Sequence, residues 1–294
     1  MEPVCDTARV RAAEAHVIAT DGADVLMQRA ASGLAGVIAD LLIERGAASG
    51  RSSSSRHSHP GQRLSGATVL VVAGSGNNGG DALFAGARLA ETGAGILVVQ
   101  TDEAVHTEGL RACQAAGGRL VGQAEVGEWI RHRRIDCVVD GVLGLGGRAG
   151  LRGPVAALAI ACRDGGVPVV AVDLPSGLEA DSGRLSGTTF RAQRTVTFGV
   201  RKPCHVLEPA ASACGEVTVV DIGLGEVPPL LAAATEDDVA AWWPVPDGTS
   251  DKYARGVVGL DTGSPQYPGA AVLSAFGATH AGAGMVRFTG ADEV

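Results

Sequence analysis

The sequence predicts an α/β fold in which a mainly parallel sheet lies between two layers of helices. Short apolar runs rich in valine alternate along the chain with longer stretches of helical periodicity. Each run is long enough for a strand buried on both faces, and repeated strand–helix units of this kind build parallel sheets covered on both sides. Apolar residues make up 46% of the 294 residues, which is enough for a substantial core.

Two helices are predicted at the start of the chain, over residues 7–20 and 24–45. The second has an apolar face at helical spacing, formed by Leu26, Ala30, Leu34, Val37, Ile38 and Leu41. A serine-rich stretch follows over 47–66. Its His57 and His59 could bind a metal, but a low-complexity linker explains this composition better.

The sheet is expected after this linker. Strands are predicted over 68–73, 95–100, 136–140 and 168–172. Helices are predicted between them over 81–92, 104–116 and 154–163. Two later apolar runs, 195–198 and 217–220, are expected to extend the sheet.

Charge and cysteine usage exclude several classes of protein. A net charge of -8 argues against nucleic acid as a partner, and the basic cluster 131–134 is better explained as a solvated helix end. The first residues lack the apolar segment of a secretory signal, and no apolar run is expected to reach membrane-spanning length. The six cysteines form no C-x-x-C pair, as expected of reduced core thiols. These features predict a soluble cytoplasmic protein with no membrane partner.

The most informative segment is a glycine-rich turn between the first predicted strand and the helix after it. It reads Gly74-Ser75-Gly76-Asn77-Asn78-Gly79-Gly80-Asp81 and holds both asparagines of the chain. A strand, a glycine turn and a helix N-terminus form a site for anions and nucleotides. The string also fits G-x-G-x-x-G, for which a tight turn without a ligand stays an alternative. It is not a Walker A loop, because the only lysines are Lys202 and Lys252.

Two more predicted strands end in an acidic residue followed by a loop. Asp140 precedes a glycine loop that leads to Pro154 at the start of a helix, and Asp173 precedes the turn Pro175-Ser176-Gly177. Each acid alone could equally cap a helix or brace a loop. Ligands of parallel sheets bind beyond the carboxyl ends of the strands, so three such loops at one edge favour a binding site.

These motifs closely resemble the NAD(P)H-hydrate epimerases, the YjeF N-terminal domain family. The resemblance rests on G-S-G-N-N-G-G-D, D-G-V-L-G-L-G-G-R, V-V-A-V-D-L-P-S-G-L and T-V-T-F-G-V-R-K-P, and it extends from Val10 to Leu224. It implies a Rossmann-like three-layer fold, a homodimer and a bound potassium ion. It also implies a reaction, the interconversion of the R and S forms of the hydrated nicotinamide cofactors NADHX and NADPHX at the C6 hemiaminal carbon.

The family's site residues carry over onto this chain position by position. The implied substrate-binding residues are Asn77, Asn78, Gly79, Gly80 and Asp81, the loop Gly144, Leu145, Gly146, Gly147, Arg148, Ala149 and Gly150, and Asp173. The implied potassium ligands are Asn78, Asp140 and Ser176. Amide, carboxylate and hydroxyl oxygens are hard donors that suit an alkali or alkaline-earth cation better than zinc. Inversion of a hemiaminal carbon needs proton transfer, and we expect Asp173 to be the catalytic general acid/base.

The last sixty or so residues have a different character. Residues 236–294 resemble the opening of an ADP/ATP-dependent NAD(P)H-hydrate dehydratase domain, as an incomplete β-α-β segment after an epimerase domain at 1–230. The dehydratase family's Asn-x-Gly-Asp motif is missing, because no asparagine follows Asn78. We therefore expect epimerase activity without dehydratase activity. We also expect this segment to pack on the first domain or to be mobile, and the natural protein to be longer.

Other functions remain open at this point. An NAD-dependent dehydrogenase would use an acid after the second strand for the ribose, and Asp102 is available. That function leaves both asparagines and Asp140 unexplained. A serine hydrolase built on Ser176 lacks the G-x-S-x-G elbow. A nucleotide-binding scaffold that serves as a protein partner is the main non-catalytic alternative, and no motif separates NADHX from NADPHX as substrate.

Overall fold

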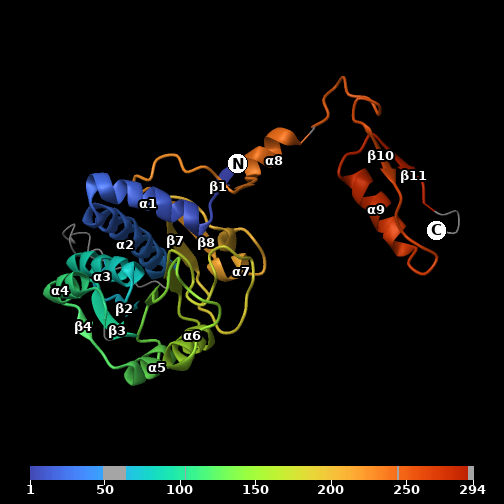
Figure 1. Cartoon of the computed structure of the whole chain (residues 1–294). Helices are drawn as coiled ribbons and strands as arrows, with labels where there is room; N and C mark the ends of the chain where they lie inside the picture. Colours follow the sequence, from blue (N-terminus) through green and yellow to red (C-terminus); the bar gives the residue numbers. More distant parts are fainter. Residues whose placement is uncertain (49–63, 103, 244, 291–294) are drawn as a thin grey trace. The chain divides into compact units, whose positions relative to one another are not determined.

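The computed structural model describes residues 1–48, 64–102, 104–243 and 245–290. His57, His59 and most of the predicted linker lie outside the described residues. The chain forms two compact units, Met1–Ala233 and Ala234–Val294 (Figure 1).

The first unit is built on a seven-stranded sheet with the strand order β4-β3-β2-β5-β6-β7-β8. All six neighbouring pairs are parallel. The strands are β2 (Thr68–Ala73), β3 (Gly95–Gln100), β4 (Arg119–Leu120), β5 (Cys137–Gly141), β6 (Val169–Val172), β7 (Arg194–Phe198) and β8 (Glu216–Val220). The predicted α/β class with a mainly parallel sheet is confirmed. The short edge strand β4 was not predicted.

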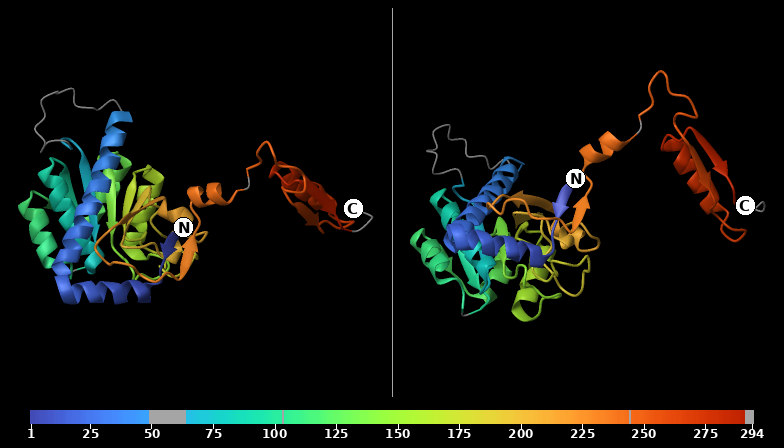
Figure 2. Two further views of the ribbon diagram at one scale, coloured as in Figure 1. Left: turned by 90° about the horizontal axis from the view of Figure 1, so that it is seen from above. Right: turned by 45° about the horizontal axis from the view of Figure 1, so that its top comes forward.

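Helices cover both faces of this sheet (Figures 1 and 2). They are α1 (Thr7–Asp21), α2 (Ala23–Ala48), α3 (Asn77–Glu91), α4 (Thr107–Ala115), α5 (Gln123–Arg131) and α6 (Gly153–Gly165). Alternate residues of β2 enter different cores because successive side chains of a strand point to opposite faces. Val69 and Val71 pack in the core that includes α2, α3 and α4, whereas Leu70 and Val72 pack with α5 and α6. Helix α5 was not predicted.

Helix α2 corrects one expectation. By length and composition, its residues 23–46 could cross a membrane, although no apolar run of that kind was expected. In the structure Ala30, Leu34, Ile38 and Leu41 are buried in the core that α2 shares with α3. The core helix of a large α/β domain passes the same test of length and composition.

Smaller elements complete the first unit. Strand β1 (Glu2–Val4) pairs antiparallel with β9 (Leu231–Ala233), so the first residues lie beside the end of this unit. Between β7 and β8 the chain forms the short 3-10 helix η2 (Pro203–His205) and the one-turn helix α7 (Ala211–Cys214).

The second unit contains α8 (Glu236–Trp242) and a strand–helix–strand segment of β10 (Val257–Leu260), α9 (Gly269–His280) and β11 (Met285–Phe288). Strands β10 and β11 are parallel neighbours. On α9, Val272, Leu273 and Phe276 are all exposed. The predicted incomplete β-α-β segment is therefore present, with an apolar helix face that this unit does not cover.

Candidate functional site

The three loops singled out in the sequence meet where the strand order reverses. Strand β2 lies between β3, which follows it along the chain, and β5, from which β6, β7 and β8 continue in the other direction. Parallel sheets of this kind bind ligands in the crevice at such a reversal, beyond the carboxyl ends of the strands. The loops after β2, β5 and β6 all end there.

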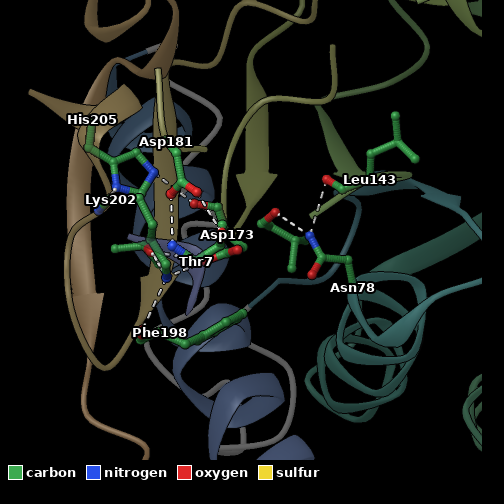
Figure 3. Close-up of polar contacts among 10 residues, drawn as sticks. Thr7, Asn78, Leu143, Asp173, Asp181, Phe198, Lys202 and His205 are labelled. Atoms are coloured by element: carbon green, nitrogen blue, oxygen red, sulfur yellow. Dashed lines mark hydrogen bonds and ion pairs between the residues drawn. The ribbon is translucent and has the colours of Figure 1, made fainter. Parts of the chain in front are cut away.

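Asn78 connects the three loops. Its side-chain Nδ2 donates hydrogen bonds to the carbonyl of Leu143 at 3.2 Å and to the carbonyl of Val172 at 2.7 Å (Figure 3). The backbone at Gly144 comes so close that an added Cβ would lie 2.3 Å from Asn78 Oδ1, so only glycine fits there. Asn77, the first residue of α3, is exposed instead. The first turn of α3 is thus held in place by Asn78.

Asp140 and Ser176 form a second, fully buried contact within the site. The Ser176 hydroxyl donates to Asp140 Oδ1 at 2.6 Å, and the Ser176 amide donates to Oδ2 at 2.8 Å. The Leu143 amide in turn donates to Ser176 Oγ at 2.9 Å. Burial raises the pKa of Asp140 to about 6, although hydrogen bonds from Ser176 and Val142 oppose the rise.

These groups fit a hard cation. Within the described part of the chain, no Lys, Arg or His pairs with the buried Asp140 carboxylate. A buried carboxylate without a positive partner is costly, and a bound cation would supply the missing charge. The Leu143 carbonyl lies 3.2 Å from Asn78 Nδ2 and 3.3 Å from Ser176 Oγ, so the oxygen-bearing groups of all three loops are close together.

The glycine loop 144–150 lies along the rim of this site. Its backbone turns between Gly144 and Gly147, whose N–H donates to the Gly144 carbonyl at 2.7 Å, and Gly150 is held by the carbonyl of Gly177 at 2.9 Å. Gly146 and Arg148, between these anchors, are exposed. The loop is therefore fixed at both ends while its middle faces solvent.

Asp173 stands at the end of β6 in an unusual backbone conformation. Its φ is 67°, in the left-handed region that residues other than glycine rarely adopt. Oδ1 accepts hydrogen bonds from Lys202 Nζ at 2.6 Å and from Thr197 Oγ1 at 3.0 Å (Figure 3). Burial alone would raise the pKa of Asp173, but the charge and hydrogen bond of Lys202 outweigh burial, and the pKa lies below its ordinary value. Asp173 is therefore a buried carboxylate that stays ionised.

His205 fixes the backbone around this ion pair. The Lys202 amide donates to His205 Nδ1 at 3.0 Å, so Nδ1 carries no proton and Nε2 carries it. Nε2 lies 2.9 Å from the Asp173 carbonyl and donates to it (Figure 3). Lys202, Thr197 and His205 are all buried, and none of them was predicted as a site residue. The available signal was that Lys202 is one of only two lysines and lies within a motif already noted.

A neighbouring group of buried ligands is less suited to a metal. Cys204, His205 and Cys214 have ligand atoms within 4.8 Å of one another. Both ring nitrogens of His205, however, already bond to the backbone of Lys202 and Asp173. The histidine has no free lone pair for an ion, and its role is structural.

Helix α1 borders the same site. Asp181 accepts hydrogen bonds from the Thr7 amide at 2.7 Å and from the Thr7 hydroxyl at 2.5 Å, which fixes the start of α1 (Figure 3). From α1, Arg11 comes within 3.6 Å of the position that a Cβ at Gly146 would take. One turn later, Glu14 is half-buried. Burial raises the pKa of Glu14, the charge of Asp173 raises it further, and the charge of Lys202 lowers it. Neither Arg11 nor Glu14 was predicted as a site residue.

Comparisons with known proteins agree on one family. The family described as YjeF-related protein N-terminus matches residues 23–204. The bifunctional NAD(P)H-hydrate repair enzyme Nnr of Mycobacterium leprae is 42% identical over 285 residues, covering 96% of this chain and 54% of that enzyme. The NAD(P)H-hydrate epimerase of Microbacterium testaceum is 42% identical over 163 residues, covering 53% of this chain and 62% of that protein. The chain spans about half the length of the bifunctional relatives it matches.

A solved structure supports the fold. The crystal structure of yeast ynu0 (YNL200c) aligns with a TM-score of 0.56 at 21% identity, covering 74% of this chain and 86% of the yeast chain. The matched range includes all three loops of the site and Lys202. The chain therefore belongs to the YjeF-related protein N-terminus family.

Proposed function

We propose that this chain is an NAD(P)H-hydrate epimerase that interconverts the R and S forms of NADHX and NADPHX. One observation carries the proposal: an ionised, buried carboxylate at Asp173 lies at the strand-order reversal, beside a group of oxygen donors suited to a cation. The relatives whose names state this activity support the choice of substrate. In this proposal the chain acts as a homodimer, which the mass of the particle in solution would test.

The proposed cation is potassium, held by Asn78, Asp140 and Ser176. When bound, it would supply positive charge to neutralise Asp140 and to attract the substrate's phosphates. The chain's own residues prepare this site. Ser176 orients both carboxylate oxygens of Asp140, and Asn78 links the loops after β5 and β6 to α3.

In the proposed reaction Asp173 transfers a proton at the hemiaminal. Its Oδ1 is occupied by Lys202 and Thr197, whereas Oδ2 forms no hydrogen bond to any described residue. Because Lys202 keeps this carboxylate ionised, Asp173 begins the cycle as a proton acceptor. A positioned general base typically accelerates such a step by about 10² to 10⁴-fold.

The test is to incubate the purified chain with R hydrate and to follow formation of the S form by chromatography, with and without potassium. We expect potassium-dependent epimerisation. In the Asp173→Asn variant it should fall by about two orders of magnitude or more, while Asp164→Asn, an exposed acid on α6, should behave as wild type. Absence of epimerisation by the wild-type chain would refute the function, and near-normal turnover of Asp173→Asn would reduce Asp173 to a binding role.

We further propose that these 294 residues do not dehydrate the S hydrate. The second unit exposes the apolar face of α9, and the segment contains no asparagine from which the dehydratase family's motif could be formed. Incubation with S hydrate and either ADP or ATP should regenerate no reduced cofactor. Nucleotide-dependent recovery above the uncatalysed rate would overturn this proposal.

A further inference from the structure

Asp81 is a buried acid whose surroundings give it no partner. Only 6% of its surface is exposed, and its carboxyl group has no hydrogen-bond or ion-pair partner among the described residues. It lies one turn after Asn78 on α3, and positions three apart share one side of a helix. Asn78 itself reaches the carbonyl of Val172, the residue before Asp173, so this side of α3 faces the site.

The three buried acids of the site differ in what compensates their charge. Asp173 has Lys202 as a counterion, and Asp140 accepts three hydrogen bonds in the group suited to a cation. Within the described part of the chain, Asp81 has neither a counterion nor a hydrogen-bond donor. Burial of an unpaired negative charge costs free energy, so a buried carboxyl group without a partner favours its neutral, protonated form.

The groups that face Asp81 from the neighbouring elements favour the same state. Burial raises the pKa of Asp81 well above its ordinary value, and the negative charges of Asp173 and of Glu14 on α1 raise it further. His106, at the start of α4, lies against the backbone of Gly80 and accepts a hydrogen bond from the Gly109 amide through Nδ1. No cation is paired with Asp81 among the described residues.

We propose that Asp81 is the proton donor of the epimerisation, a neutral carboxylic acid that works opposite the ionised Asp173. This inference rests on the proposed function and extends it, because a site with one permanent base still needs a group that carries a proton. Two carboxyl groups whose environments favour opposite protonation states are the usual arrangement of an acid/base pair.

The proposed step balances without a further reactant. Asp81 gives its proton to the C6 hydroxyl, the C6–O bond breaks with its electron pair on oxygen, and water leaves while the ring nitrogen's lone pair forms a double bond to C6. Water then adds to the opposite face of C6, that double bond returns its electrons to nitrogen, and Asp173 takes the proton of the added water. The net change is inversion at C6 and one proton moved from Asp81 to Asp173, which solvent exchange reverses.

The first test is the pH dependence of epimerisation at saturating potassium. In the wild-type chain the rate should fall at high pH as Asp81 loses its proton. Asp81→Asn, nearly the same shape but without an acidic proton, should lower kcat by about 10² to 10⁴-fold and abolish the high-pH fall. Glu14→Gln removes a negative charge that acts on Asp81 and should move the high-pH fall to lower pH. Asp164→Asn, which changes an exposed acid on α6, is the matched control and should leave both the rate and the pH profile unchanged.

The second test does not depend on activity. Infrared difference spectra of the folded chain at neutral pH should contain the C=O stretch of a protonated carboxylic acid, which disappears in Asp81→Asn and persists in Asp164→Asn. Any one of three results would overturn the inference. The infrared band could persist in Asp81→Asn, the pH profile of this variant could match that of wild type, or Glu14→Gln could leave the high-pH fall where it is. If the wild-type chain epimerises the substrate and one of these results is found, the proposed function stands and only the role of Asp81 is refuted. A wild-type chain that never epimerises refutes the proposed function, and the infrared band still decides whether Asp81 holds its proton.

Discussion

Replacing Lys202 by methionine removes the counterion of Asp173 and keeps most of the side-chain volume. Lys202 is 1% exposed, and its Nζ donates to Asp173 Oδ1 at 2.6 Å, to Thr197 Oγ1 at 2.8 Å and to the Phe198 carbonyl at 3.2 Å. Methionine supplies none of these donors. Asp173 would remain fully buried with only Thr197 as a partner for its carboxylate.

Removal of one partner of a buried ion pair costs about 3–5 kcal/mol, because the other charge stays buried and uncompensated. For a domain of this size that corresponds to a fall in Tm of roughly 10 °C. Because the pKa of Asp173 is lowered in the folded wild-type chain, the stabilisation is present above the unfolded pKa and is lost as pH falls through the folded pKa. The difference in stability between wild type and Lys202→Met should therefore be largest near neutral pH and shrink below about pH 4.

Lys202→Met should also lower the rate of epimerisation. Without Lys202, burial raises the pKa of Asp173, so the base holds its proton more often and epimerisation falls by about 10²-fold or more. Part of the activity should return as pH rises. Lys252→Met, which changes the chain's other, exposed lysine, is the matched control for thermal unfolding and for rate. The double variant Asp173→Asn/Lys202→Met should be less destabilised than Lys202→Met alone. A Lys202→Met protein with wild-type Tm and pH profile would refute the ion-pair argument.

Three further perturbations test other parts of the site. Asp140→Ala should weaken substrate binding and make the rate insensitive to potassium, and a variant that still responds to potassium as wild type does would refute the shared cation site. Gly144→Ala should raise the KM for substrate, because its methyl group would lie 2.3 Å from Asn78 Oδ1. In the control Gly146→Ala the methyl group would meet only Arg11 Nη2 at 3.6 Å, so the change in KM should be small. Equal changes in KM would contradict the close approach of Gly144 to Asn78. Asp81→Asn should gain stability relative to wild type as pH rises above about 4, the ordinary pKa of an aspartate. The raised pKa of Asp81 means that its contribution to wild-type stability is fully present below the unfolded pKa and is lost as pH rises toward the folded pKa. A Tm difference independent of pH would therefore show that folding does not raise the pKa of Asp81.

The sheet could be predicted where a strand is buried on both faces. Strands β2 and β3 begin and end at the predicted residues, because short continuous runs rich in valine, leucine and isoleucine favour strands buried on both faces of a parallel sheet. Strand β4 has only two residues, both exposed, so no apolar pattern marks it. Strands β1 and β9 pair across the whole first unit, and neither is long enough to show a period.

The site was predictable where a loop directly follows a strand. Topology places Asn78, Asp140 and Asp173 at one edge as soon as the strands are parallel, and the structure brings all three loops together. Lys202 and His205 lie on the segment after β7, and only the folded chain brings them to Asp173. Glu14 comes from a helix that the sheet pattern does not position.

The charge state of each acid is a property of the folded chain that the motifs do not contain. Asp81, Asp140 and Asp173 are the same residue type, all buried, all beside helix N-termini or strand ends. They differ in the partner that tertiary structure supplies. Asp173 has a lysine from the segment after β7, Asp140 has a serine from the loop after β6, and Asp81 has no partner among the residues that the structure describes. An ionised base and a neutral acid thus arise within one site from identical side chains, and substitution of Lys202 should change the charge state of Asp173 without any change to the acids themselves.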